Sequence, residues 1–338
     1  MHLVIANAAL HLKALRPSPS REDNLVALAH VEAAMMSVNQ RIPDSRQNAT
    51  DEILGAILGL MCHALNSLRF DHYARHVEGF QTILDLCGGL RSIESATNIR
   101  LSLFWIEFNT CAAQDAIPRF LPPFHLIKNP YSAIHESLGR DHFEKAMQVG
   151  GISSFLTAEM LDVFSELSLL TMALRAETPQ RIRWDDDNFP GFGFYPTLHK
   201  LLTMQVNPAE DDLKHGVQEM CRLGALFFLA EVRRKFGIAP VITGVQSEKL
   251  HRLFEYNGRL WDEELAHMRI WTFVMAACAA DTPVDRLWAV KSLIGSESSI
   301  PGAWDKPIGV VANMWWIDEV FLAKSEGLQA EFMALSST

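Results

Sequence analysis

The sequence lacks the features that define several large protein classes. It has five cysteines in 338 residues and no Cys-x-x-Cys pair, so a cysteine zinc site is not indicated. Each cysteine stands in an apolar helical pattern, where a buried free thiol is the usual state. The formal net charge is −10, and no basic run of five residues occurs. We therefore expect no cofactor and no direct nucleic-acid binding by this chain.

Long apolar runs and strand patterns are also scarce. No run reaches the roughly 18–20 apolar residues that cross a bilayer, so no membrane contact is expected. The N-terminal segment 1–15 is apolar but lacks a basic leader and a clear cleavage site. The clearest β-like piece, residues 239–243, is short. These absences favour a chain that is helical throughout.

Helical periodicity predicts an all-α fold, an irregular multi-helix domain of roughly a dozen helices. No linker is long or polar enough to demand a second domain, so residues 1–338 are interpreted as a single helical domain. Residues 181–196 are predicted to be a loop, because prolines and glycines interrupt them. The predicted helices are 2–15, 22–41, 50–68, 71–87, 96–114, 140–148, 154–176, 208–235, 247–260, 263–280, 283–295 and 306–335.

Two predicted helices contain long apolar segments. In the first, residues 53–65, Gly55 and Gly59 would let a neighbouring helix approach closely. The second contains residues 223–230, which include no polar side chain and predict a core helix or a subunit interface. Asn207 and Pro208 form a start signal for this second helix.

The segment 71–90 carries two histidines beside an apolar stripe. His72 and His76 are four residues apart, a spacing that suits metal ligands. No partner motif is visible, however, and a hydrogen-bonded histidine at the edge of the core is the favoured interpretation. Gly88 and Gly89 are expected to end the helix. The stripe consists of Tyr73, Val77, Phe80, Leu84 and Cys87.

Motifs for enzymatic chemistry are weak. The acidic run 185–188 could bind a cation through oxygen atoms, but it leads directly into Phe189-Pro190-Gly191, so a solvated loop is favoured. Gly191-x-Gly193 has no third glycine and no preceding strand. No nucleophile–base pair can be inferred. The tryptophans are expected mainly in the core, although they could also line an apolar ligand cavity.

Two neighbouring segments, 76–90 and 98–124, together resemble the fungal-specific transcription factor domain, the helical middle region of fungal zinc-cluster regulators. That family shows a His-Leu-x-Gly helix ending in Gly-Gly, then a helix with a Trp-x-Asp-like step, then an Arg-Pro-x-Phe-like turn. Glu107 stands where the family commonly has Asp, and Pro118-Arg119 reverses the usual order of the turn. The family-signature positions are His76, Gly79, Gly88, Gly89, Trp105, Phe120 and Pro122.

The resemblance implies a transcription-factor-like regulatory protein that acts in the nucleus, and a secondary-metabolite cluster is one candidate target. The six clustered cysteines of the family's zinc module are missing, so we expect a truncated regulator or a standalone relative without its own DNA reader. Its partners would be a hydrophobic small molecule, a second copy, or a regulatory protein.

An alternative is a repurposed, cytoplasmic helical domain that binds or transforms a hydrophobic metabolite. Whether the chain is an enzyme stays open at this point, with a non-enzymatic role favoured. The candidate ligand-binding residues are Trp105, His72, His76, Glu107 and Arg119.

Overall fold

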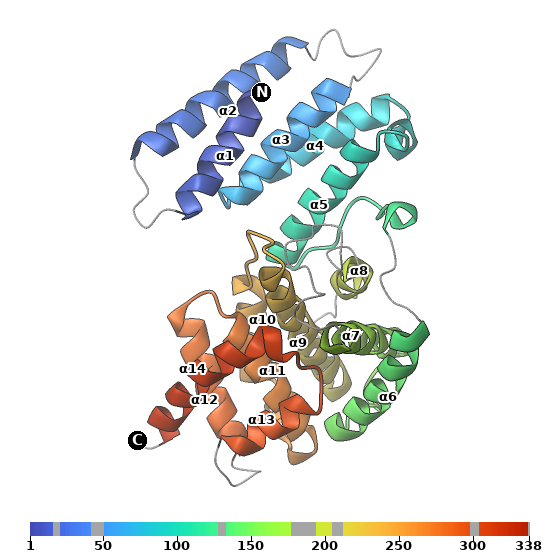
Figure 1. The fold of residues 1–338 in the computed structure, drawn as a ribbon, viewed down its shortest axis with the longest axis vertical. Coiled ribbons are helices and arrows are strands. Elements are labelled where there is room, and N and C mark those ends of the chain that lie inside the picture. Colours follow the sequence, from blue (N-terminus) through green and yellow to red (C-terminus); the bar gives the residue numbers. More distant parts are fainter. Residues whose placement is uncertain are drawn as a thin grey trace. The chain divides into compact units, whose positions relative to one another are not determined.

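Every regular element that the structure describes is a helix (Figure 1). This computed structural model describes residues 1–15, 21–41, 51–127, 133–176, 194–204, 212–297 and 304–336. The helices are labelled α1 to α14, with short 3-10 helices between them, so the predicted all-α fold of about a dozen helices is confirmed. None of the described helices combines the length and apolar character that crossing a membrane requires.

The chain forms two compact units. Unit 1 contains Met1–Thr110 and Arg119–Leu126, and unit 2 contains Cys111–Pro118 and Ile127–Thr338. The interpretation of 1–338 as a single domain stays a prediction. We describe each unit by itself.

Unit 1 is built from the first helices of the chain. Helix α1 packs against α2 and α3, and α3 packs against α4 (Figure 1). The apolar residues of α3, α4 and α5 form one core, to which α2 contributes Val38. The elements are α1 (His2–Leu15), α2 (Arg21–Arg41), α3 (Asp51–Asn66), α4 (Phe70–Leu86), η2 (Gly89–Ile93), α5 (Thr97–Gln114) and η3 (Phe124–Leu126). Helix α5 belongs to unit 1 as far as Thr110, and its last four residues belong to unit 2.

The two glycines of α3 differ in their surroundings. A Cβ atom on Gly59 would lie 3.0 Å from Cβ of Leu3, so α1 does approach α3 closely at this point, as predicted. A Cβ atom on Gly55 would meet nothing within 4 Å, so the same prediction is wrong there. Sequence alone cannot separate the two positions, because both lie in one apolar helix.

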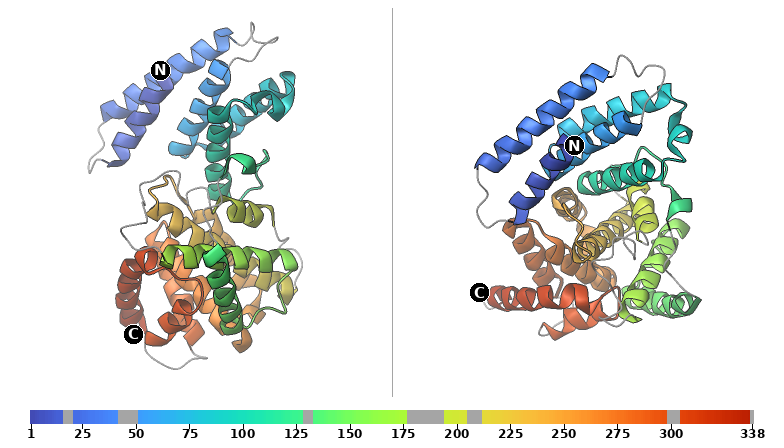
Figure 2. Two further views of the ribbon diagram at one scale, coloured as in Figure 1. Left: turned by 45° about the vertical axis from the view of Figure 1, so that its right-hand side comes forward. Right: turned by 45° about the horizontal axis from the view of Figure 1, so that its top comes forward.

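Unit 2 is organised around α9 and α11, which pack against each other and are buried almost all round. The apolar segment 223–230 is buried in this core, so the core-helix prediction is confirmed. Helices α6 and α7 pack together, and α12 packs on α11 (Figure 2). The elements are α6 (Ala133–Gly150), α7 (Ala158–Ala176), α8 (Tyr195–Thr203), α9 (Leu213–Lys235), α10 (Gly244–Tyr256), η4 (Gly258–Trp261), η5 (Glu263–Leu265), α11 (Ala266–Ala279), α12 (Pro283–Glu297), α13 (Asp305–Ala312) and α14 (Asp318–Ser336).

Several predicted boundaries in unit 2 were wrong. Helix α6 is far longer than the predicted 140–148, and α8 begins at Tyr195, inside the predicted loop, with Pro196 in its first turn. No strand forms at 239–243 in the described structure. Helix α9 begins after Asp212, whose carboxylate accepts a hydrogen bond from the N–H of Lys214, and the predicted cap at 207–208 lies outside the described residues.

The predicted helix 306–335 is broken into α13 and α14 by a turn that includes the two adjacent tryptophans. The carbonyl oxygen of Trp315 accepts the indole N–H of Trp271 at 2.9 Å, and that of Trp316 accepts Nε of Arg175 at 2.7 Å. In the described structure these two carbonyls accept side-chain donors of α11 and α7 rather than backbone N–H groups. Tertiary contacts therefore hold the turn between α13 and α14.

Candidate functional site

Helix α4 carries the predicted stripe. Its apolar face, including Tyr73, Val77, Phe80 and Leu84, is buried in the core of unit 1, as predicted. Gly88 has φ +99° and Gly89 has φ +75°, left-handed values that confirm the double glycine as the end of the helix. Gly79, a family-signature position, is exposed, and a Cβ atom there would meet nothing within 4 Å. Packing therefore does not require glycine at residue 79.

The two histidines of α4 stay at the edge of the unit. His72 is exposed and lies 2.7 Å from Arg69 through Nε2, and 3.5 Å from a carboxylate oxygen of Asp71. His76 is half-buried, and burial lowers its pKa, with further lowering by the nearby His72 and His63. Among the described residues, no group of three or more His, Cys, Asp and Glu side chains could hold a metal ion.

Helix α5 carries the remaining ligand candidates. Trp105 is half-buried and packs against the core of unit 1. Two residues later, Glu107 is 1% exposed, which is unusual for a carboxylate unless its oxygens have partners.

The partners of Glu107 are backbone amides of the segment Arg119–Leu126, which we call the strap. The Glu107 carboxylate accepts hydrogen bonds from the N–H groups of Arg119 and Phe120, the latter at 3.2 Å. Phe120 is buried in the unit 1 core, in edge-to-face contact with Phe80 at 6.0 Å between ring centroids. Glu107 therefore anchors the strap on α5.

A second buried side chain of α5, Arg100, holds the strap at Leu121, the residue after Phe120. It is 3% exposed and donates from Nη2 to the carbonyl oxygen of Leu121 at 2.6 Å. Its Nε lies 3.6 Å from a carboxylate oxygen of Glu94, and that carboxylate also lies 3.0 Å from Nε2 of His125. Neither Nε nor Nη1 of Arg100 has a hydrogen-bond partner in the described structure.

The structure thus brings together only part of the predicted ligand set. Glu107 contacts the backbone of Arg119, and Trp105 lies on the same helix. Within the part of the chain that the structure describes, the polar contacts of His72 are with Arg69 and Asp71, and neither His72 nor His76 is bonded to α5 or the strap. The prediction missed Arg100. Its position seven residues before Glu107, on the same helical face, is a signal that the sequence did contain.

Unit 2 has its own cluster of buried charges. Arg222 on α9 forms a bidentate pair with Asp115, with both N–O distances at 2.7 Å, and a second pair with Glu219. Lys249 of α10 also binds Asp115. Burial raises the pKa of both carboxyls. For Asp115, the hydrogen bonds from Arg222 and Lys249 outweigh burial, so its pKa lies below the ordinary value. Glu219 shares Arg222 and is repelled by Asp115, so its pKa stays above the ordinary value.

These contacts connect the end of α5 with α9 and α10 inside unit 2. Because the cluster's charges already bind one another, we interpret it as structural.

Comparison with known proteins identifies no related protein. No protein-family model matches the chain, and no curated protein or solved structure shows significant similarity to it. The resemblance to the fungal regulator domain therefore stays a prediction.

Proposed function

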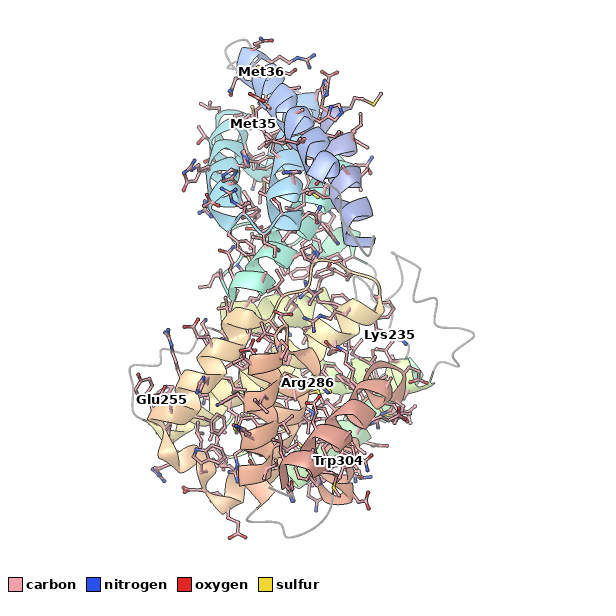
Figure 3. The ribbon with its side chains drawn as sticks, turned by 90° about the vertical axis from the view of Figure 1, so that its left-hand side faces the viewer. Met35, Met36, Lys235, Glu255, Arg286 and Trp304 are labelled. Carbon is pink, nitrogen blue, oxygen red and sulfur yellow. The ribbon has the colours of Figure 1, made fainter. Side chains whose placement is uncertain are left out.

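We propose that this chain is a transcription-factor-like regulatory domain that acts through contact with a partner protein. The observation that carries the proposal is an apolar face on α2. Leu25, Leu28 and Met36 are between 56% and 61% exposed, while Ala27 and Ala34, on the opposite side of the same helix, are buried. Figure 3 shows Met35 and Met36 on α2. Exposed apolar surface of this kind is typical of interaction sites.

The spacing of the exposed residues along α2 suits contact with a helix of a partner protein. Residues 25, 28, 32, 35 and 36 follow the three- and four-residue pattern of one helical side. An amphipathic helix of a partner could pack its own apolar stripe against it. The methionines favour such contact, because their flexible side chains adapt to a partner's shape.

Glu32 indicates which kind of partner fits. It is an exposed charge in the middle of the face, and it forms no ion pair with any residue that the structure describes. A two-fold contact between copies, centred on this face, would bring the two Glu32 carboxylates together, and that repulsion disfavours a homodimer. We therefore assign the face to a partner helix with a Lys or Arg opposite Glu32.

The ligand-based interpretation has less support. Glu107, a candidate for ligand binding, uses its carboxylate to hold the strap, and Trp105 packs on the core. Binding or conversion of a hydrophobic metabolite, a nuclear location and a role in secondary metabolism stay predictions.

The experiment compares transcripts in the organism that makes the protein. A strain with the double substitution Leu28→Glu and Met36→Glu should change the same transcripts as a deletion strain, while Ser37→Glu, at an exposed position on the same helix, should behave as wild type. Immunoblots check that protein levels are equal.

Three outcomes would contradict the proposal. A double variant that behaves as wild type would exclude the α2 face. A deletion that changes no transcript but leaves a metabolite unconverted would favour the metabolic alternative. A dimer in sedimentation equilibrium that Met36→Glu abolishes would show that a second copy is the partner.

A further inference from the structure

The clamp on the strap contains an acid in an unusual environment. Burial raises the pKa of the Glu107 carboxyl to about 7. The hydrogen bonds from the Arg119 and Phe120 amides and the charges of Arg119 and Arg100 lower the pKa, but their effect is smaller than that of burial. On the α4 side, Phe120 packs against the uncharged ring of Phe80. Near neutral pH, Glu107 is thus divided between its protonated and ionised forms.

The protonated form can still hold the strap, although the Phe120 amide then loses its contact with Oε2. Oε1 of Glu107 lies within hydrogen-bond distance of both the Arg119 and the Phe120 amides. A carboxyl that carries its proton on Oε2 keeps Oε1 as a carbonyl acceptor, so both bonds persist. Protonation removes the cost of burying a charge without removing the clamp.

Opening of the strap would expose Glu107 to water, where its pKa would return to about 4.5. The closed state therefore binds the proton more tightly than the open state. Between these two pKa values the closed state carries more protons, so raising the pH favours opening. The proton's contribution to closure is fully present below about pH 4.5 and is lost as the pH rises through about 7.

Two further side chains of the clamp bear on opening without adding to its pH dependence. His125 of the strap lies 3.0 Å from a carboxylate oxygen of Glu94, which adds one more contact that closure makes. Arg100 is buried with Nε and Nη1 lacking hydrogen-bond partners in the described structure, and opening would let water reach them.

We propose that the strap is a proton-linked latch, which lies closed on α5 while the Glu107 carboxyl carries its proton and opens when that carboxyl ionises, releasing Phe120 from the unit 1 core. Opening would expose the aromatic ring of Phe120 and the apolar surface that it covers near Phe80. The inference does not depend on the α2 face, so either proposal can fail alone.

Hydrogen exchange of the full chain between pH 5 and 8 tests the latch. After correction for intrinsic exchange, the protection of the Arg119 and Phe120 amides should fall roughly 70-fold over this range, as expected for a carboxyl whose pKa changes from about 7 to 4.5 on opening. In Glu107→Gln, which keeps an acceptor but cannot ionise, protection should not depend on pH. Amides in the middle of α4 serve as the control for unfolding of unit 1 and should stay constant.

Three results would overturn the latch: constant protection in the wild type, the same pH dependence in Glu107→Gln, or a parallel loss at α4. Should Glu107→Gln fail to fold, the ¹³C shift of the Glu107 carboxyl in the wild-type protein decides. An apparent pKa clearly above the ordinary 4.5 supports the latch, and an ordinary value excludes it.

Discussion

Unit 1 and unit 2 bury charge in different ways. In unit 2, Arg222 lies between Asp115 and Glu219, and Lys249 adds a second cation, so charges neutralise one another. In unit 1, Glu107 is buried against backbone amides, and Arg100 leaves donors unused in the described structure. Paired buried ions resist change, whereas a carboxyl held by neutral amides can respond to protons.

The units also differ in their apolar surfaces. Helices α9 and α11 of unit 2 are buried on almost all sides. Helix α2 of unit 1 buries small side chains such as Ala27 and Ala34 and exposes larger ones, including Leu28 and Met36. The two regions on which our proposals rest, the α2 face and the strap, therefore both lie in unit 1.

The largest expected effect is the loss of the ion cluster in unit 2. Arg222→Met leaves Asp115 and Glu219 buried without their main partner, and we expect the free energy of unfolding to fall by about 3–5 kcal/mol. Urea denaturation followed by tryptophan fluorescence measures it. Arg252→Met, which removes an exposed pair with Glu248, is the matched control and should cost about 0.5 kcal/mol or less. A cost below that of the control would break the proposed contrast between the units.

A smaller effect is expected where α9 and α11 meet. A Cβ atom on Gly224 would lie 2.5 Å from the ring of Trp271, so Gly224→Ala forces the two helices or the ring to shift. We expect a loss of about 1–3 kcal/mol in the free energy of unfolding, as for other overpacked cores. Native-state hydrogen exchange should place the loss in α9 and leave α3 unchanged. Equal losses in both helices would mean that the two units unfold together.

The smallest expected effect is a gain in stability, and it concerns Gly55 in unit 1. A Cβ atom on Gly55 of α3 meets nothing within 4 Å, so Gly55→Ala removes backbone freedom from the unfolded chain without creating a clash. Exchange protection of α3 should rise by about 0.5–1 kcal/mol. Destabilisation instead would show that α3 has a close neighbour at this position.

The local elements were largely predictable from the sequence. The stripe of α4 and its stop at Gly88 and Gly89 follow from residue spacing and from glycine's freedom at positive φ. Helix α8 was missed because its nine residues begin beside Pro196, which we interpreted as a loop signal. The candidate site was predicted in part. Glu107 and Arg119 do meet, but as an anchor of the strap.

The sequence by itself determined where most helices lie and which of their faces are apolar, because periodicity is a local property of the chain. Tertiary structure alone decided which of those faces are covered, since the stripe of α4 is buried while that of α2 is exposed. It also decided the role of Glu107. The partners of that carboxylate are backbone amides, which every residue but proline carries and which no side-chain pattern reveals.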